Sequence, residues 1–154
     1  MRTLTISLCA IGLLVSHAAD AAEPVSATAR NGLCAVALPE VNLTADNFAQ
    51  RILDADVKVA TATPKADPAG DLTWEMFRQI DKQKTGAFEI LDRKAKQIVG
   101  KSVGDLKVDP VAVAFARGEV NMMIGYCSAA PDQVRNVPGA QIVRIPTSLA
   151  PPPQ

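Results

Sequence analysis

The segment from residue 61 to residue 71, TATPKADPAGD, has the residue types and spacing of a ligand-binding loop. It follows a short β-branched run and precedes a helical pattern that opens near Asp71, so we expect a strand-to-helix loop. Its two prolines lack backbone donors, and Gly70 allows another group to approach the backbone closely. A helix start behind the loop would offer unpaired N–H groups and a positive dipole end. This combination predicts an anion site. The alternative is an ordinary helix-start turn with water on its amides.

The charged residues of this segment have simpler interpretations than ligand binding. Lys65 is expected to be a solvated loop lysine rather than a counter-charge. Asp67 and Asp71 would repel an anion if they faced it. We therefore expect Asp71 to lie in the first helical turn and Asp67 to close the turn through its own backbone.

The composition excludes several classes of function. The chain has 154 residues, of which 48% are apolar, and a formal net charge of zero. This length and composition suit one domain with a packed core. Because no basic cluster stands out, we expect no nucleic-acid partner.

The N-terminal region predicts export. Residues 1–21 combine Arg2, an apolar run and a small-x-small pattern, as a signal peptide does, with cleavage before Ala22. The alternative is a short membrane anchor, which the brevity of the apolar run disfavours. The expected location is the periplasm or another exported compartment. Residues 22–32 are expected to form a flexible tail. Cleavage would remove His17, the only histidine, together with Cys9.

Two cysteines would remain in the mature chain. An oxidising compartment favours a disulfide between Cys34 and Cys127, and two buried thiols are the alternative. With no histidine left, we expect neither a metal site nor acid–base catalysis. A Cys-x-x-Cys motif is absent from the sequence, and Cys127 has no evident base partner. We therefore predict that the protein is not an enzyme.

Strand and helix patterns alternate along the mature chain. Strands are expected at 33–38, 57–63, 120–126 and 141–145, and helical patterns at 44–54, 71–82, 88–100 and 111–117. This alternation predicts an α/β fold with a largely parallel sheet and helices on both faces. Ligands bind such sheets beyond the carboxyl ends of the strands. The loop after Thr63, the linker before Pro110 and the residues around Tyr126 should meet there.

Three segments in order resemble a known family. ATPKADPAGDLTWEMF, ARGEVNMMIGYCSAA and VPGAQIVRIP are similar to the TPKADPxGDYxW, GxADxxxxYC and VPxLQIVxLP segments of periplasmic substrate-binding proteins of the molybdate type. NGLCAVALPEVNLTADNFAQRILDADVKV also looks like the family's stretch ahead of the first segment, and KQIVG ends the helical stretch after it. The resemblance covers most of residues 30–150.

The resemblance implies one lobe of a type II periplasmic-binding-protein fold. A family member has two α/β lobes with an oxyanion between them, and the matching region corresponds to the second lobe. We expect an α/β solute-binding lobe at 33–149 and a proline-rich tail at 150–154. A signal peptide stands where the first lobe should precede it. The expectation is a shortened member or a remnant of a longer gene.

The resemblance also implies a ligand and the groups that hold it. The ligand would be molybdate, tungstate or a similar oxyanion, with no cofactor. The backbone amides of Ala69 and Gly70, a backbone contact near Val108 and the hydroxyl of Tyr126 would bind it. The alternative for Tyr126 is a strand-end aromatic that packs in the core. An ABC transporter permease would be the partner, and the protein would contact the membrane only through that transporter.

Two further functions compete with ligand binding for import. A non-binding exported interaction module is the first alternative, because a single lobe exposes the face that met its partner lobe. That face could support a homodimer. An enzyme is the last alternative, for the reasons given above.

Overall fold

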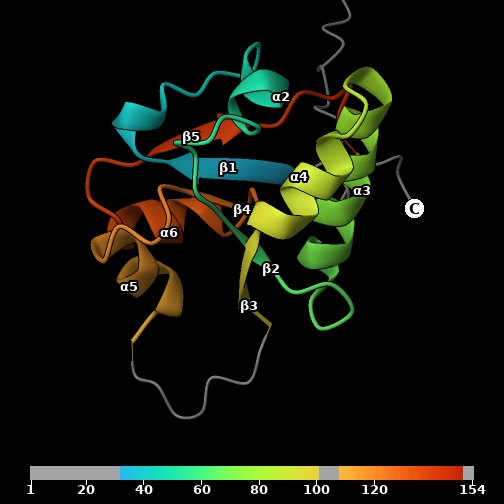
Figure 1. The fold of residues 1–154 in the computed structure, drawn as a ribbon. Coiled ribbons are helices and arrows are strands. Elements are labelled where there is room, and N and C mark those ends of the chain that lie inside the picture. The colour runs from blue at the N-terminus through green and yellow to red at the C-terminus, as the bar shows by residue number, and fades with distance from the viewer. Residues whose placement is uncertain (1–31, 101–107, 151–154) are drawn as a thin grey trace, which may run out of the picture.

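The computed structural model describes residues 32–100 and 108–150, which fold around one five-stranded sheet. The expected signal peptide, nearly all of the expected tail at 22–32 and residues 151–154 lie outside the described residues. The strand order is β3-β2-β4-β1-β5, and Figure 1 shows the sheet between two groups of helices. The strands are β1 (Leu33–Ala37), β2 (Val59–Ala62), β3 (Lys96–Val99), β4 (Met122–Tyr126) and β5 (Gln141–Arg144).

Strand β1 runs against the other four. It pairs antiparallel with β4 and with β5, whereas β2 pairs parallel with β3 and with β4. The sheet is therefore largely parallel, as predicted. In the β1–β4 register Leu33 lies opposite Tyr126. Strand β1 thus begins at the end of the sheet where the parallel strands have their carboxyl ends. We call this end the carboxyl edge and the other end the amino edge.

The helices cover both faces of the sheet. They are α2 (Phe48–Arg51), α3 (Pro68–Gln83), α4 (Ala87–Lys94), α5 (Pro110–Ala116) and α6 (Ala130–Asn136), with a 3-10 turn at Pro39–Val41. Helices α2, α3 and α4 pack on one face, where Phe48, Phe77 and Leu91 join the largest apolar cluster. Helices α5 and α6 pack on the other face through two smaller clusters. Because side chains alternate along each strand, the strands contribute apolar side chains to the cores on both faces.

Two predicted helices differ from those observed. The helix expected at 44–54 is a single turn, α2, preceded by a reciprocal pair of bonds in which Thr44 and Asn47 accept each other's amides. The pattern at 88–100 divides into α4 and the edge strand β3, with Ala95 in extended geometry between them. Helical spacing continued to Ala95 because that residue still packs in the core. The periodicity therefore concealed the change of structure. Helix α6 was also missed.

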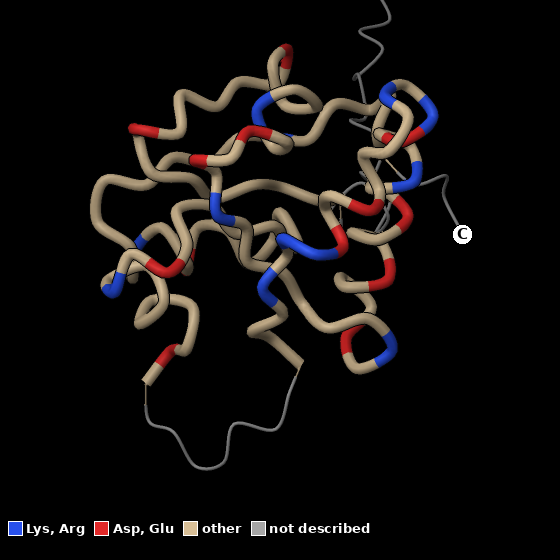
Figure 2. Tube along the Cα trace, viewed as in Figure 1, with Lys and Arg blue, Asp and Glu red and all other residues tan. Residues whose placement is uncertain are grey.

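Charges of both signs are interspersed along the described chain (Figure 2). This distribution agrees with the formal net charge of zero. The cores on the two faces are apolar, and the only buried polar residues among those described are Thr61 and Thr73. Thr61 lies on β2 and Thr73 on α3, two elements that pack together.

Candidate functional site

Helix α3 begins three residues earlier than the sequence predicted. Asp67 is its N-cap residue, Pro68 occupies the first turn, and the Asp67 carboxylate accepts a hydrogen bond from the Ala69 amide at 2.8 Å. The carbonyl of Thr63 accepts the amides of Ala66 and Asp67. The helix opens early because an aspartate cap and a proline in the first turn are strong start signals. Ala69 and Gly70 therefore belong to the first helical turn, and Asp67 closes the turn as predicted, with its side chain accepting the backbone amide two residues on.

The amides of Ala69 and Gly70 both have acceptors inside the chain. The Gly70 amide donates to the carbonyl of Asp67 at 2.9 Å. The Ala69 amide donates to the Asp67 carboxylate, which thus stands where an external anion would accept the bond. A ligand at the Ala69 amide has to replace this carboxylate.

Gly70 is needed for close packing between the helix and the loop. A Cβ atom added at Gly70 would lie 2.6 Å from the backbone nitrogen of Pro64 and 2.6 Å from the carbonyl carbon of Thr63. These neighbours are backbone atoms, which cannot turn aside as a flexible side chain can. The glycine therefore lets the first turn of α3 rest directly on the loop.

The loop is closed a second time by Asp71. Its carboxylate accepts the amide of Lys65 at 3.0 Å, and Lys65 has a positive φ of 65°. Asp71 lies in the first turn of α3, as predicted. Two carboxylates thus organise the loop by accepting its amides.

Tyr126 lies near the same loop. It is the last residue of β4 and is partly buried. Burial raises the pKa of its phenol, and the negative charges of Asp67 and Asp71 raise it further. Strands β2 and β4 are adjacent and parallel, so the end of β4 at Tyr126 and the loop after β2 lie at the same end of the sheet. Tyr126 and the first turn of α3, with Ala69 and Gly70, thus belong to the same end of the sheet.

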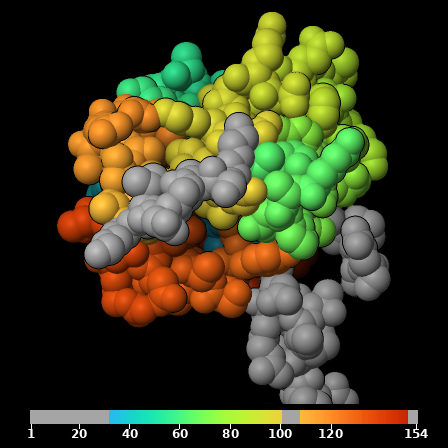
Figure 3. All heavy atoms as spheres, turned by 90° about the horizontal axis from the view of Figure 1, so that it is seen from below, coloured from blue at the N-terminus to red at the C-terminus, as the bar shows by residue number. Residues whose placement is uncertain are grey.

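Val108 belongs to the same edge through its element. It precedes Asp109, whose carboxylate caps α5 by accepting the Val111 amide at 2.9 Å. Asn136 of α6 donates to the other carboxylate oxygen at 3.1 Å. Because β3 is parallel to β2, the chain leaves β3 at the carboxyl edge before it reaches α5. The Val108 side chain is 57% exposed. Figure 3 views this edge from below, with the loop in green.

Cys34 and Cys127 form a disulfide with their Cα atoms 4.8 Å apart. Cys127 follows Tyr126 directly, and its amide donates to the carbonyl of Gly32 at 2.7 Å. The bond joins β1 to the end of β4 on the face covered by α6, where Cys34 packs with Ala130. It fixes the backbone from which the tyrosine projects.

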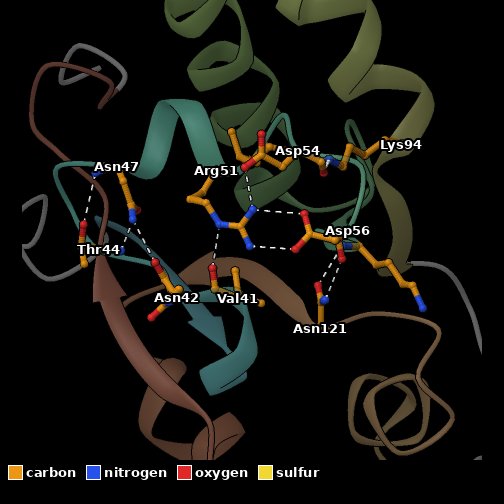
Figure 4. Close-up of polar contacts among 11 residues, drawn as sticks. Val41, Asn42, Thr44, Asn47, Arg51, Asp54, Asp56, Lys94 and Asn121 are labelled. Atoms are coloured by element: carbon orange, nitrogen blue, oxygen red, sulfur yellow. Dashed lines mark hydrogen bonds and ion pairs between the residues drawn. The ribbon is translucent and has the colours of Figure 1, made fainter.

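A polar network that the sequence did not reveal lies around the start of β2 (Figure 4). Arg51 donates to the carbonyl of Val41 and to the carboxylates of Asp54 and Asp56. Hydrogen bonds from Arg51 hold the pKa of Asp56 below its usual range. Asn121, just before β4, donates to the Asp56 carbonyl and accepts the amide of Lys58. Because these residues precede the parallel strands, the network lies at the opposite edge from Tyr126.

Lys94 joins this network from the end of α4. Its ammonium group donates to the carbonyls of Ile52 and Asp54 at 2.7 and 2.6 Å. Burial lowers its pKa. The network therefore ties α2 and α4 to the starts of β2 and β4. Its polar groups are paired with one another, as a structural role requires.

Two other kinds of site were sought in residues 32–100 and 108–150. No cluster of three or more histidine, cysteine, aspartate or glutamate side chains there is arranged to hold a metal ion. No helix in those ranges has the length and apolar character needed to cross a membrane.

The sequence matches the family described as bacterial extracellular solute-binding protein over residues 9–154. The chain belongs to this family. Family members bind solutes outside the cytoplasm, which supports an exported or periplasmic location. The sheet with helices on both faces is consistent with a single lobe of a periplasmic-binding-protein fold.

The chain is also similar to the uncharacterized protein PM1146 of Pasteurella multocida (strain Pm70). The two are 36% identical over 73 residues, which are 47% of this chain and 30% of the relative. The chain thus matches under a third of the length of that relative.

Proposed function

We propose that this solute-binding protein holds an oxyanion, such as molybdate or tungstate, for an ABC importer. The observation that supports the proposal best is that Tyr126 ends β4 at the same end of the sheet as the loop that leads from β2, its parallel neighbour, into α3. The phenol can donate one hydrogen bond to the anion. The starts of α3 and α5 both follow parallel strands, so their positive dipole ends belong to this edge.

Binding in this scheme exchanges one carboxylate for another anion. Asp67 occupies the Ala69 amide at 2.8 Å, so the ligand takes over that bond while Asp67 turns away. The exchange and the open edge both weaken binding, because a solvated anion gains less from each contact. Enclosure by a second lobe would strengthen it. We therefore propose weak binding by this lobe alone.

Isothermal titration with molybdate, tungstate and sulfate tests the proposal. The expected result is binding of at least one of them at millimolar concentration or tighter, with about threefold to tenfold weaker binding by Tyr126→Phe. Arg135→Gln, which changes an exposed residue of α6, is the matched control and should bind as the original chain does. Absence of binding to all three anions would overturn the oxyanion proposal.

A second candidate is an exported interaction module that binds no small solute. The specific observation in its favour is that the amides of Ala69 and Gly70 already have internal acceptors, beside two carboxylates. Light scattering coupled to size exclusion distinguishes the two. A stable homodimer together with silent titrations supports the module, whereas a monomer that binds an anion supports the importer component.

A further inference from the structure

Two hydroxyl groups on β2 and just beyond it are buried without a hydrogen-bond partner. They are the Oγ1 atoms of Thr61 and Thr63, which have no partner within residues 32–100 and 108–150. Thr73, which is also buried, satisfies its hydroxyl by donating to the carbonyl of Ala69 at 2.7 Å. Valine has nearly the same shape as threonine and carries no such cost. Unpaired buried hydroxyls are uncommon enough to require a reason.

The two threonines occupy different places. Thr61 is fully buried within β2, opposite Ile124 of β4. Thr63 lies beyond the end of β2 and is only partly buried as a residue, and its backbone touches the first turn of α3 at Gly70. Thr63 follows Thr61, the last residue of β2 paired with β4, at the end of the sheet where Tyr126 ends β4. Alternation along β2 places Thr61 on the side of the sheet that α3 covers, and the close approach of Gly70 to the Thr63 backbone places Thr63 against α3 as well.

We infer that Thr63 supplies a second side-chain hydrogen bond to the bound solute, beside Tyr126. The inference rests on the proposed function and adds a residue to that site. A threonine hydroxyl can donate to an oxyanion or accept from a protonated one. The Thr63 hydroxyl is buried, the first turn of α3 approaches the Thr63 backbone at Gly70, and Asp67 holds the Ala69 amide. A rotation about χ1, among staggered positions, turns the hydroxyl toward a solute that replaces Asp67.

Thr61 provides a matched control within the same strand. Its hydroxyl is also unpaired, but Thr61 is fully buried within β2, two residues before Thr63. Replacing either threonine with valine removes an unpaired buried hydroxyl and keeps the shape. Neither replacement should therefore lower the midpoint of thermal unfolding. Only the replacement at Thr63 should change ligand binding.

The test is titration of the folded chain and its Thr63→Val, Thr63→Ser and Thr61→Val variants with molybdate, tungstate and sulfate. We expect Thr63→Val to weaken binding about tenfold, and the other two variants to bind within twofold of the original chain. Equal affinity of Thr63→Val and the original chain would overturn the inference and leave the proposed function intact. Equal losses in Thr63→Val and Thr61→Val would also overturn it. If the original chain binds none of the anions, the proposed function fails, and the inference fails with it.

Discussion

At the scale of single residues, the candidate site depends on how closely the backbone of α3 approaches the loop. Gly70 is the residue that permits this approach, because a Cβ atom there would overlap the backbone of Thr63 and Pro64. The sequence indicated a glycine that admits a neighbour. It did not indicate that the neighbour is the protein's own loop.

Replacing Gly70 with alanine should destabilise the fold. The added carbon meets backbone atoms at 2.6 Å, and we expect a loss of about 2 kcal/mol or more in the free energy of unfolding. Gly125→Ala is the control, because the nearest atom to its added carbon is the end of the Met123 side chain at 3.7 Å. Urea denaturation measures both. Similar effects of the two changes would contradict the close approach at Gly70.

Tyr126 offers a direct measure of the charge around the site, because it is the only tyrosine in the sequence. The absorbance of tyrosinate should titrate with a midpoint above the ordinary pKa of 10.0. Asp67→Asn should lower that midpoint without fully restoring the ordinary value, since burial is the larger cause. Glu75→Gln, farther along α3, should leave it unchanged.

The sign of the pH effect on stability follows from the raised pKa of Tyr126. Because the folded state binds this proton more tightly, the stabilisation is complete below the ordinary pKa and is lost as the pH rises through the folded value. A tyrosinate midpoint at or below 10.0 would contradict the partial burial of the phenol together with the effect of the Asp67 and Asp71 charges. Circular dichroism over the same range shows that the titrated state is still folded.

At the scale of elements, the two ends of the parallel strands have different tasks. The carboxyl edge carries the candidate site, and the amino edge is held by the network around Arg51. A single guanidinium there joins the 3-10 turn, through Val41, to the segment between α2 and β2. The network positions the start of β2 and therefore fixes the register of the strand that leads into the loop.

Arg51→Gln should cost about 1–3 kcal/mol of unfolding free energy, because it leaves a carbonyl and two carboxylates without their donor. The Arg51 side chain is only 19% exposed. Arg135→Gln is the matched control: its side chain is 71% exposed, and we expect a change within about 0.5 kcal/mol. Urea denaturation of both variants checks the difference. Losses of equal size would mean that the network around Arg51 stabilises the fold no more than an exposed ion pair does.

The start signals of helices were more informative than their apolar spacing. Asp109-Pro110 combines a capping aspartate with a proline suited to the first helical position, and α5 begins there. Asp67-Pro68 carries the same signal, but the glycine two residues later suggested a longer loop. Strand β3 was missed because a helix precedes it without a glycine or proline to mark the boundary. As an edge strand it is also only partly buried, so its residues lack strong alternation.

At the scale of the whole molecule, the sequence predicted the fold class and the edge of the sheet that carries the candidate site. The antiparallel position of β1 in the strand order could not be predicted from the sequence, because pairing between distant strands depends on three-dimensional packing. The sequence also did not predict that the amides of Ala69 and Gly70 both donate to acceptors inside the chain. Whether an amide bonds to a nearby carboxylate or stays free depends on side-chain direction, which residue spacing does not encode.

The disulfide should contribute to the stability of the whole fold. It closes a sequence separation of 93 residues, and such a loop corresponds to about 4–5 kcal/mol in the chain-entropy model. We expect the double variant Cys34→Ala, Cys127→Ala to lose about 2–5 kcal/mol of unfolding free energy. Urea denaturation with and without dithiothreitol checks this. Dithiothreitol should weaken the original chain and leave the double variant unchanged, and an insensitive original chain would contradict the prediction.

The antiparallel course of β1 has a mechanical consequence. The start of β1 lies beside the end of β5, with the Ile145 amide bonded to the Leu33 carbonyl at the tip of the pair. Tension applied between residues 32 and 146 would break the β1–β5 hydrogen bonds one after another, starting at this end of the pair. It would not load all of them at once, as a shearing force does. The Cys34–Cys127 bond ties β1 to the end of β4 at the same tip. Under load, β5 would therefore peel away first, while the strand beside Tyr126 stayed in place.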